Sequence, residues 1–231
     1  MRVIAHRSGP DGVYPEQTIL TAQAALKSGA HMIELDVRYT KDKRIAISHD
    51  KELGRVFGVS CETDTLTEAE FLSLRHKNAP AFSSHLFEHY MMAEVAPILI
   101  HIKEEELIDD LIALIEKYQY GDKVVFGVQS VALAEHLKKK DPRYLVLAFM
   151  PRLEDLDAYG ASSVDYIRLW EQWCTAENVS RIHSYKKEAW LMTNGEDVGV
   201  TSEESLLRML TLNLDGILIN DVHKLLCLLD S

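Results

Sequence analysis

Two histidines and two carboxylates stand at the ends of apolar, strand-like runs within the first fifty residues. The runs VIAHR, HMIELDV and IAISHD contain His6, Glu34, Asp36 and His49. Imidazole can accept and donate protons near neutral pH. Glu34 and Asp36 are two positions apart on one expected strand, so both side chains point to the same face and can reach one cation. These groups are the ones that metal-assisted acid–base chemistry on a charged ester requires.

The surrounding residues favour the same chemistry. Arg7 follows His6, and its planar fork of donors suits phosphate oxygens. The run that holds Glu34 and Asp36 is otherwise apolar, and buried acids are costly unless they are paired or bound to metal. We therefore interpret the two acids as ligands of Mg²⁺ or Ca²⁺ through oxygen. A salt bridge to Arg7 or Lys103 is the alternative.

Composition restricts the class of protein. A chain of 231 residues suits one α/β barrel. Its net charge of −11 disfavours binding to nucleic acid or to an anionic membrane, although a local basic or metal site can still hold a phosphate. Three scattered cysteines favour a reducing compartment. With no apolar run of membrane-spanning length and no signal peptide, we expect a soluble, cytoplasmic protein without a stable membrane anchor. A homo-oligomer is possible.

Short apolar strands alternate with amphipathic helical stretches along most of the chain. Strand–helix alternation indicates a parallel sheet with right-handed crossovers. Only the short turn TKDKR separates the second and third expected strands, which suggests a direct strand-to-strand step. The sequence predicts strands at Val3–Arg7, Met32–Val37, Arg44–His49, Pro97–Ile102, Lys123–Val128, Tyr144–Phe149, Tyr166–Leu169, Ala189–Thr193 and Gly216–Ile219.

The segment VIAHRSGPDGVYPEQT, followed by GAHMIELDVRYTKDKRIAISHD, resembles the N-terminal signature of the glycerophosphodiester phosphodiesterase family. That signature runs H-R-G, P-E-N-T, G-A, E-x-D-V, T-x-D, H-D. Weaker similarity continues through ILIHIK, EAWLMTN and LDGILIND. The resemblance implies an enzyme that cleaves glycerophosphodiesters into an alcohol and glycerol 3-phosphate, using a divalent metal and two histidines. It also implies a (β/α)₈ TIM barrel.

We therefore expect residues 1–231 to form a single barrel domain. Nine strands are one more than the barrel needs, so we expect either the Met32–Val37 or the Arg44–His49 strand to lie outside the regular βα count. A small insertion is expected after the third strand, between Lys51 and Pro97.

The resemblance also assigns roles to individual residues. His6 and His49 become the two proton-transfer residues, and the substrate is a small-molecule phosphodiester. The implied substrate and phosphate contacts are Arg7, Glu16, Lys103 and, through EAWLMTN, Trp190. Gln17 stands where the family usually has Asn and still offers an amide.

The sequence departs from the family pattern at His101. The strand ILIHIK places His101 where the family has a glutamate that binds metal. Imidazole is neutral and softer than carboxylate, so Mn²⁺, Co²⁺ or Zn²⁺ becomes possible besides Mg²⁺ or Ca²⁺. The family's serine–phenylalanine motif is also reduced to GVQS, at Gln129 and Ser130. Two alternatives follow: a catalytically impaired barrel that binds a phosphorylated ligand, or a phosphodiesterase for a different phosphodiester.

Overall fold

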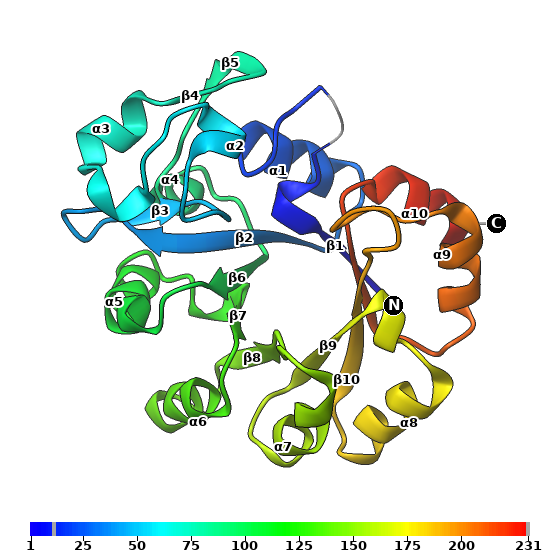
Figure 1. Ribbon diagram of the computed structural model, residues 1–231. Coiled ribbons are helices and arrows are strands. Elements are labelled where there is room, and N and C mark those ends of the chain that lie inside the picture. The colour runs from blue at the N-terminus through cyan, green and yellow to red at the C-terminus, as the bar shows by residue number, and fades with distance from the viewer. Residues whose placement is uncertain (11–12, 230–231) are drawn as a thin grey trace.

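Eight parallel strands form a closed barrel in the computed structural model, which describes residues 1–10 and 13–229. Strand β1 pairs with both β2 and β11, and this double pairing closes the ring (Figure 1). Around the ring the strands are β1 (Arg2–Ala5), β2 (Met32–Tyr39), β6 (Ile98–Ile102), β7 (Val124–Val128), β8 (Leu145–Ala148), β9 (Tyr166–Trp170), β10 (Glu188–Met192) and β11 (Gly216–Ile219). The predicted (β/α)₈ fold is confirmed.

The strands are almost continuous apolar runs because both faces of the sheet are covered. One face packs on the outer helices, and the other fills the barrel. The apolar interior is built by Ile4, Met32, Leu99, Val125, Leu147, Phe149, Tyr166, Trp190, Met192 and Leu218. Every strand of the ring contributes to that cluster, so the barrel is a packed core with space for a site only near its ends.

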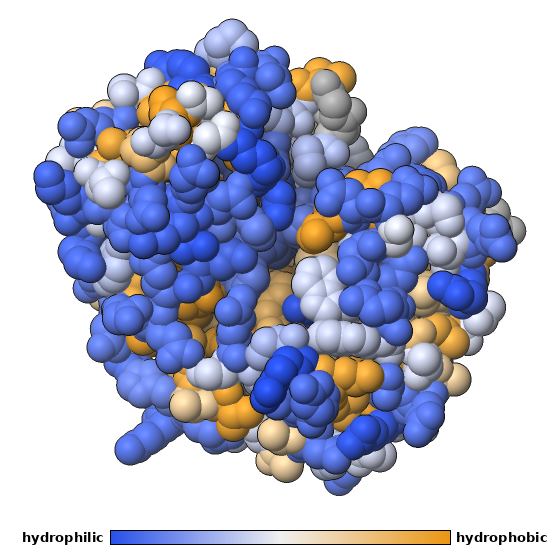
Figure 2. Space-filling model, viewed as in Figure 1, coloured by the Kyte–Doolittle hydropathy of each residue, from blue (hydrophilic) through white to orange (hydrophobic). Residues whose placement is uncertain are grey.

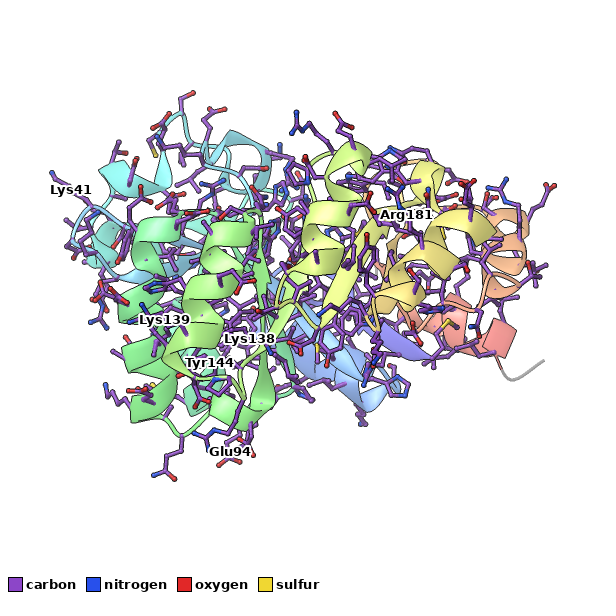
Figure 3. The ribbon with its side chains drawn as sticks, turned by 90° about the horizontal axis from the view of Figure 1, so that it is seen from below. Lys41, Glu94, Lys138, Lys139, Tyr144 and Arg181 are labelled. Carbon is purple, nitrogen blue, oxygen red and sulfur yellow. The ribbon has the colours of Figure 1, made fainter. Side chains whose placement is uncertain are left out.

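Amphipathic helices surround the barrel. In α5 (Ile108–Lys117), Ile108, Leu111, Ile112 and Ile115 are buried, which is helical spacing. The other large outer helices are α1 (Ile19–Lys27), α6 (Val131–Lys140), α8 (Ala176–Ser184), α9 (Glu203–Leu210) and α10 (Val222–Leu229), with the shorter α7 (Leu156–Ala161) between β8 and β9. Figure 3 shows α5, α6, α7 and α8 side by side, with Lys139 and Arg181 on their exposed surface. No helix in the described part of the chain has the length and hydropathy needed to cross a membrane.

The ninth predicted strand lies outside the ring. Strand β3 (Ile45–Ile47) runs antiparallel to β2 and pairs with it at Val37, Arg38 and Tyr39. The insertion follows, with α2 (Gly54–Phe57), α3 (Glu68–Ser73), β4 (Arg75–His76), β5 (Ala79–Ser83) and α4 (Phe87–Met92). It has a small core of its own, made of Ala46, Leu53, Phe57, Phe71 and Leu86. In Figure 1 most of the insertion, in cyan, covers the side of the barrel next to β2 and β3.

The first strand is shorter than predicted. It ends at Ala5, and His6–Ser8 form a 3₁₀ turn instead of continuing the extended chain. Arg7 has a left-handed backbone conformation, with φ of 48°. This turn directs the backbone N–H of Arg7 back toward β2, where it donates to Glu34 Oε2 at 2.9 Å.

Candidate active site at the ends of the strands

The polar residues predicted from sequence gather at the C-terminal ends of β1, β2 and β6. His6 follows β1, Glu34 and Asp36 lie on β2, and His101 lies on β6. The parallel register of β2 and β6 pairs Asp36 with His101. This is the end of a (β/α)₈ barrel at which active sites are found. Figure 2 shows the surface hollowed near the centre of the face in view, bordered by hydrophilic residues on the side of the insertion.

Glu34, Asp36 and His101 form a candidate metal site. Each offers one ligand atom, these atoms lie within 4.8 Å of one another, and all three residues are buried. His101 Nδ1 is 3.0 Å from Asp36 Oδ1 and 3.8 Å from Glu34 Oε1. Asp36 Oδ1 also lies 3.0 Å from Lys103 Nζ, yet it accepts no hydrogen bond with favourable geometry from the described residues. A buried carboxylate oxygen with free lone pairs fits a cation ligand.

The charges of the site also fit a cation. Burial and the neighbouring charge of Asp36 raise the pKa of Glu34. Burial opposes ionisation of Asp36 too, but Lys103 and His101 outweigh it and hold the pKa of Asp36 well below its usual range. Two adjacent buried carboxylates resist being ionised together. A bound divalent cation would offset the repulsion between the two negative charges. Both carboxylates could then be deprotonated, as metal ligands must be.

Neighbouring residues hold the two acids in place. Gln17 Nε2 donates to Asp36 Oδ2 at 2.7 Å, and the Arg7 backbone N–H holds Glu34. Gln17 reaches Asp36 from a left-handed backbone conformation, with φ of 56°. The amide that replaces the family's asparagine therefore orients a candidate metal ligand. The salt bridge left open as an alternative is also present, since Lys103 contacts Asp36 beside the other two ligands.

His101 is held as a neutral ring. Burial and the charge of Lys103 lower its pKa to about 3. The ring stacks on Phe149 at 3.9 Å, and Gly127 makes room, since a Cβ there would lie 2.4 Å from Phe149. His101 Nε2 is 2.9 Å from the side-chain amide of Gln129. The atom that faces the ring is Gln129 Nε2, which donates to His101 Nε2 and leaves Nδ1–H directed at Asp36 Oδ1. Rotating the amide by 180° would let its oxygen accept Nε2–H and free the Nδ1 lone pair for a metal.

His6 is buried and paired with a neutral amide. Its Nδ1 lies 2.7 Å from Asn220 Oδ1, and because the amide oxygen can only accept, Nδ1 carries the proton. Burial and the charge of Arg7 lower the pKa of His6 to about 4, so Nε2 keeps a free lone pair at neutral pH. Sequence reasoning missed Asn220, although it lies within the quoted segment LDGILIND.

His49 has a charged partner instead. Its Nδ1 donates to Asp50 Oδ1 at 2.7 Å, and Arg55 of the insertion bonds the other oxygen of Asp50. Arg55 also forms a bidentate ion pair with Glu16, through hydrogen bonds of 2.7 and 2.8 Å. Arg7 Nη1 contacts Glu16 at 3.3 Å. A continuous chain of charged groups thus runs from His49 to Arg7. His49 and His6 are close enough for the charge of one to lower the pKa of the other.

Trp190 is the expected contact that the structure does not bring to the site. It lies in the middle of β10, fully buried, with its ring stacked on Tyr166 at 4.6 Å and its Nε1 donating to Glu188. Glu188 begins β10 and pairs with Arg2 at the start of β1, so Trp190 belongs to the opposite end of the barrel. The structure therefore does not place Trp190 at the strand ends where the other predicted site residues gather. Ser130 caps helix α6, where its hydroxyl accepts from the Leu133 N–H.

Fold and site together define a (β/α)₈ barrel with a candidate metal and acid–base site at the C-terminal strand ends. The model of the glycerophosphoryl diester phosphodiesterase family matches residues 6–224. The chain belongs to that family.

Known proteins agree with this placement. A glycerophosphodiester phosphodiesterase of Bacillus altitudinis is 38% identical over 103 residues, which cover 45% of this chain and 39% of the relative. One from Caldanaerobacter subterraneus is 29% identical over 153 residues, covering 61% and 63%. The matched part of this chain thus spans less than two thirds of either relative.

Solved structures share the fold. An Oleispira antarctica phosphodiesterase, solved with the product sn-glycerol-3-phosphate, superimposes with a TM-score of 0.85 at 19% identity, covering 100% of this chain and 97% of that one. The glycerophosphodiester phosphodiesterase of Thermotoga maritima gives a TM-score of 0.78 at 20% identity, covering 98% and 97%.

Proposed function

We propose that this protein hydrolyses glycerophosphodiesters to an alcohol and glycerol 3-phosphate. The observation that carries the proposal is the convergence of two histidines and three candidate metal ligands at one end of a barrel of this family. Arg7 and Lys103 lie beside the same site and supply positive charge for a phosphate.

Glu34, Asp36 and His101 would hold the divalent metal. When bound there, the cation supplies Lewis-acid polarisation of a phosphoryl oxygen and makes a hydroxyl nucleophile more acidic. The mixed set of two carboxylates and one imidazole favours Mn²⁺, Co²⁺ or Zn²⁺ relative to Mg²⁺ or Ca²⁺. Gln17 and the Arg7 backbone orient the carboxylates, so the ligand geometry exists before substrate arrives.

The partners of the two histidines divide their roles. His6 is neutral and paired with an amide, which suits a base that takes a proton at Nε2 from the nucleophilic hydroxyl. Burial lowers the pKa of His49, but the Asp36 and Asp50 carboxylates oppose that shift by stabilising an imidazolium. Such a ring suits the acid that protonates the leaving alkoxide. The nucleophile is water or the glycerol 2-hydroxyl. Glu16, fixed by Arg7 and Arg55, is placed to accept a hydrogen bond from a substrate hydroxyl.

A panel of glycerophosphodiesters tests the proposal. Release of glycerol 3-phosphate is measured with Mg²⁺, Ca²⁺, Mn²⁺, Co²⁺, Zn²⁺ and chelator. We expect metal-dependent turnover that falls by about 10²–10⁴-fold in His6→Ala and in His49→Ala. His136→Ala, an exposed histidine on α6, is the matched control and should leave the rate unchanged. Wild-type rates in either site variant would refute the mechanism.

His101 also favours a second candidate, a barrel that binds a phosphorylated ligand with little turnover. Saturable binding of glycerol 3-phosphate without hydrolysis of any diester in the panel would support it. Hydrolysis restricted to another diester class would support a different phosphodiester substrate.

The remaining assignments rest on composition. We propose that residues 1–231 act as one barrel domain in the cytoplasm, in line with the free cysteines Cys61, Cys174 and Cys227. The net charge of −11 favours small-molecule substrates over nucleic acid.

A further inference from the structure

Arg168 is a buried cation that the site described above does not use. It lies on β9 between Tyr166 and Trp170, whose side chains share its inward face, and only 4% of it is exposed. Its Nε and Nη1 atoms have no hydrogen-bond partner among the described residues. No carboxylate in the described ranges forms an ion pair with it.

Its surroundings place Arg168 next to the candidate metal site. The guanidinium lies over the Trp170 ring at 4.0 Å and 5.5 Å from the centre of the Phe149 ring. Phe149 in turn stacks on His101, so one aromatic ring separates the guanidinium from a candidate metal ligand. Strand β9 is four strands away from β2 in either direction around the ring. Arg168 therefore faces the Glu34 and Asp36 strand across the barrel.

A purely structural role explains this arrangement poorly. Interior positions of such barrels are usually filled by apolar side chains, which carry no charge to desolvate. Burial lowers the pKa of Arg168 to about 9, so it remains a cation at neutral pH. Contact with two aromatic faces recovers only part of the lost hydration. The buried guanidinium of Arg168 therefore lacks an anionic partner among the described residues.

We propose that Arg168 binds an oxyanion of the substrate. This proposal rests on the proposed function for the identity of the substrate, but the guanidinium's need for an anion does not depend on turnover. The oxyanion is either the phosphate that is cleaved or an acidic group on the alcohol. Both present two oxygens that match the fork of a guanidinium, which the point charge of a lysine does not reproduce.

Binding measurements test this without requiring catalysis. Calorimetric titrations are compared for the wild type, Arg168→Met and Arg168→Lys. Binding of sn-glycerol 3-phosphate is measured with and without divalent metal, and binding of glycerophosphoserine in chelator, where it is not hydrolysed. We expect at least tenfold weaker binding in Arg168→Met and an intermediate loss in Arg168→Lys. Arg152→Met, an exposed arginine, is the control and should bind like the wild type.

The affinities for the two ligands distinguish between the two candidate oxyanions. Weaker binding of both by Arg168→Met assigns the guanidinium to the phosphate. Weaker binding of glycerophosphoserine alone assigns it to the acidic alcohol. Unchanged affinity for both, or no saturable binding of either by the wild type, would overturn the proposal. A protein that binds but hydrolyses no diester would contradict the proposed function and leave this one intact.

Unfolding temperatures distinguish anion binding by Arg168 from a role in packing alone. If Arg168 is present for anion binding, Arg168→Met removes a buried charge and should unfold at the same temperature as the wild type or a higher one. A lower unfolding temperature in both Arg168→Met and Arg168→Lys, together with unchanged ligand affinity, would show that the residue serves packing.

Discussion

The two histidines of this site differ mainly in the residue that each one faces. Asn220 gives His6 a neutral acceptor, whereas Asp50 gives His49 a negative one. A neutral acceptor fixes the tautomer without stabilising the protonated ring, so a buried His6 stays a base at neutral pH.

Asn220→Asp tests this division. A carboxylate beside His6 stabilises its protonated form and raises its pKa from about 4, by about 1–3 pH units for a close opposite charge. Because the base must be unprotonated, activity is lost below that pKa. The acid limb of the kcat/KM profile should therefore move to higher pH, with the rate at alkaline pH largely kept. Asn220→Ala should instead lower kcat at every pH. An acid limb that does not move in Asn220→Asp would contradict the assignment of His6 as base.

His101→Glu tests the departure from the family pattern. Restoring a carboxylate adds negative charge to the ligand set, so Mg²⁺ and Ca²⁺ should gain activity relative to Mn²⁺, Co²⁺ and Zn²⁺. Metal titrations of both proteins at one pH provide the measurement, because ligation by imidazole depends on pH. Glu34→Gln is the matched comparison, since it removes charge from the same site and should weaken every metal. An identical order of metals in wild type and His101→Glu would exclude His101 from the ligand set.

At the scale of single residues, the sequence was enough to identify the candidate reactive groups but not the residues that they face in the fold. His6, Glu34, Asp36 and His49 stand out because polar residues are rare at the ends of apolar runs. Asn220 and Arg168 are joined to the site only by the closing of the ring, which brings β11 beside β1 and β9 opposite β2. The expected position of Trp190 differs from the structure for a related reason. Alternation along a strand predicts which residues face inward, but not how deep in the barrel they lie.

At the scale of elements, apolar runs bounded by turns predicted β3 and the eight strands of the ring, but not the short β4 and β5 of the insertion. The short turn after β2 correctly indicated a strand outside the ring. Helices α4 and α7 have six residues each, and one and a half turns give little hydrophobic periodicity from which to predict a helix. The 3₁₀ turn at His6 was also missed. Its left-handed Arg7 is held by the contact with Glu34, which is a tertiary interaction.

The loop between β10 and α9 holds His6, the proposed base, in place, and Gly199→Ala tests this. Gly199 has φ of +85°, and a Cβ there would lie 2.2 Å from Asn220 Oδ1 and 2.5 Å from His6 Nδ1. The variant should lose most of its kcat, because His6 and its partner must move, while the circular dichroism of the barrel remains. Gly121→Ala is the control, since a Cβ there meets nothing within 4 Å. Full activity in Gly199→Ala would show that the contact between His6 and Asn220 is dispensable.

At the scale of the whole molecule, the metal site should stabilise the barrel that builds it. The ring places Glu34 and Asp36 beside His101, and the raised pKa of Glu34 shows that ionising it is harder in the folded protein than in the unfolded chain. Without metal, this group's contribution to stability therefore falls as pH rises from 4.5 through the raised value. A cation that binds only the folded state stabilises ionised Glu34 and so offsets this loss of stability.

Thermal unfolding at neutral pH measures the effect. A cation at a hundred times its Kd stabilises the folded state by about 2.7 kcal/mol. For a domain of this size, that corresponds to a Tm higher by about 5–10 °C than in chelator. Glu34→Gln should lose most of the rise and, in chelator, be at least as stable as the wild type, since it removes the buried acid. Glu204→Gln, an exposed acid on α9, should respond to metal like the wild type. An equal rise in Glu34→Gln and Glu204→Gln would place the stabilising cation elsewhere on the protein and exclude Glu34 as a ligand.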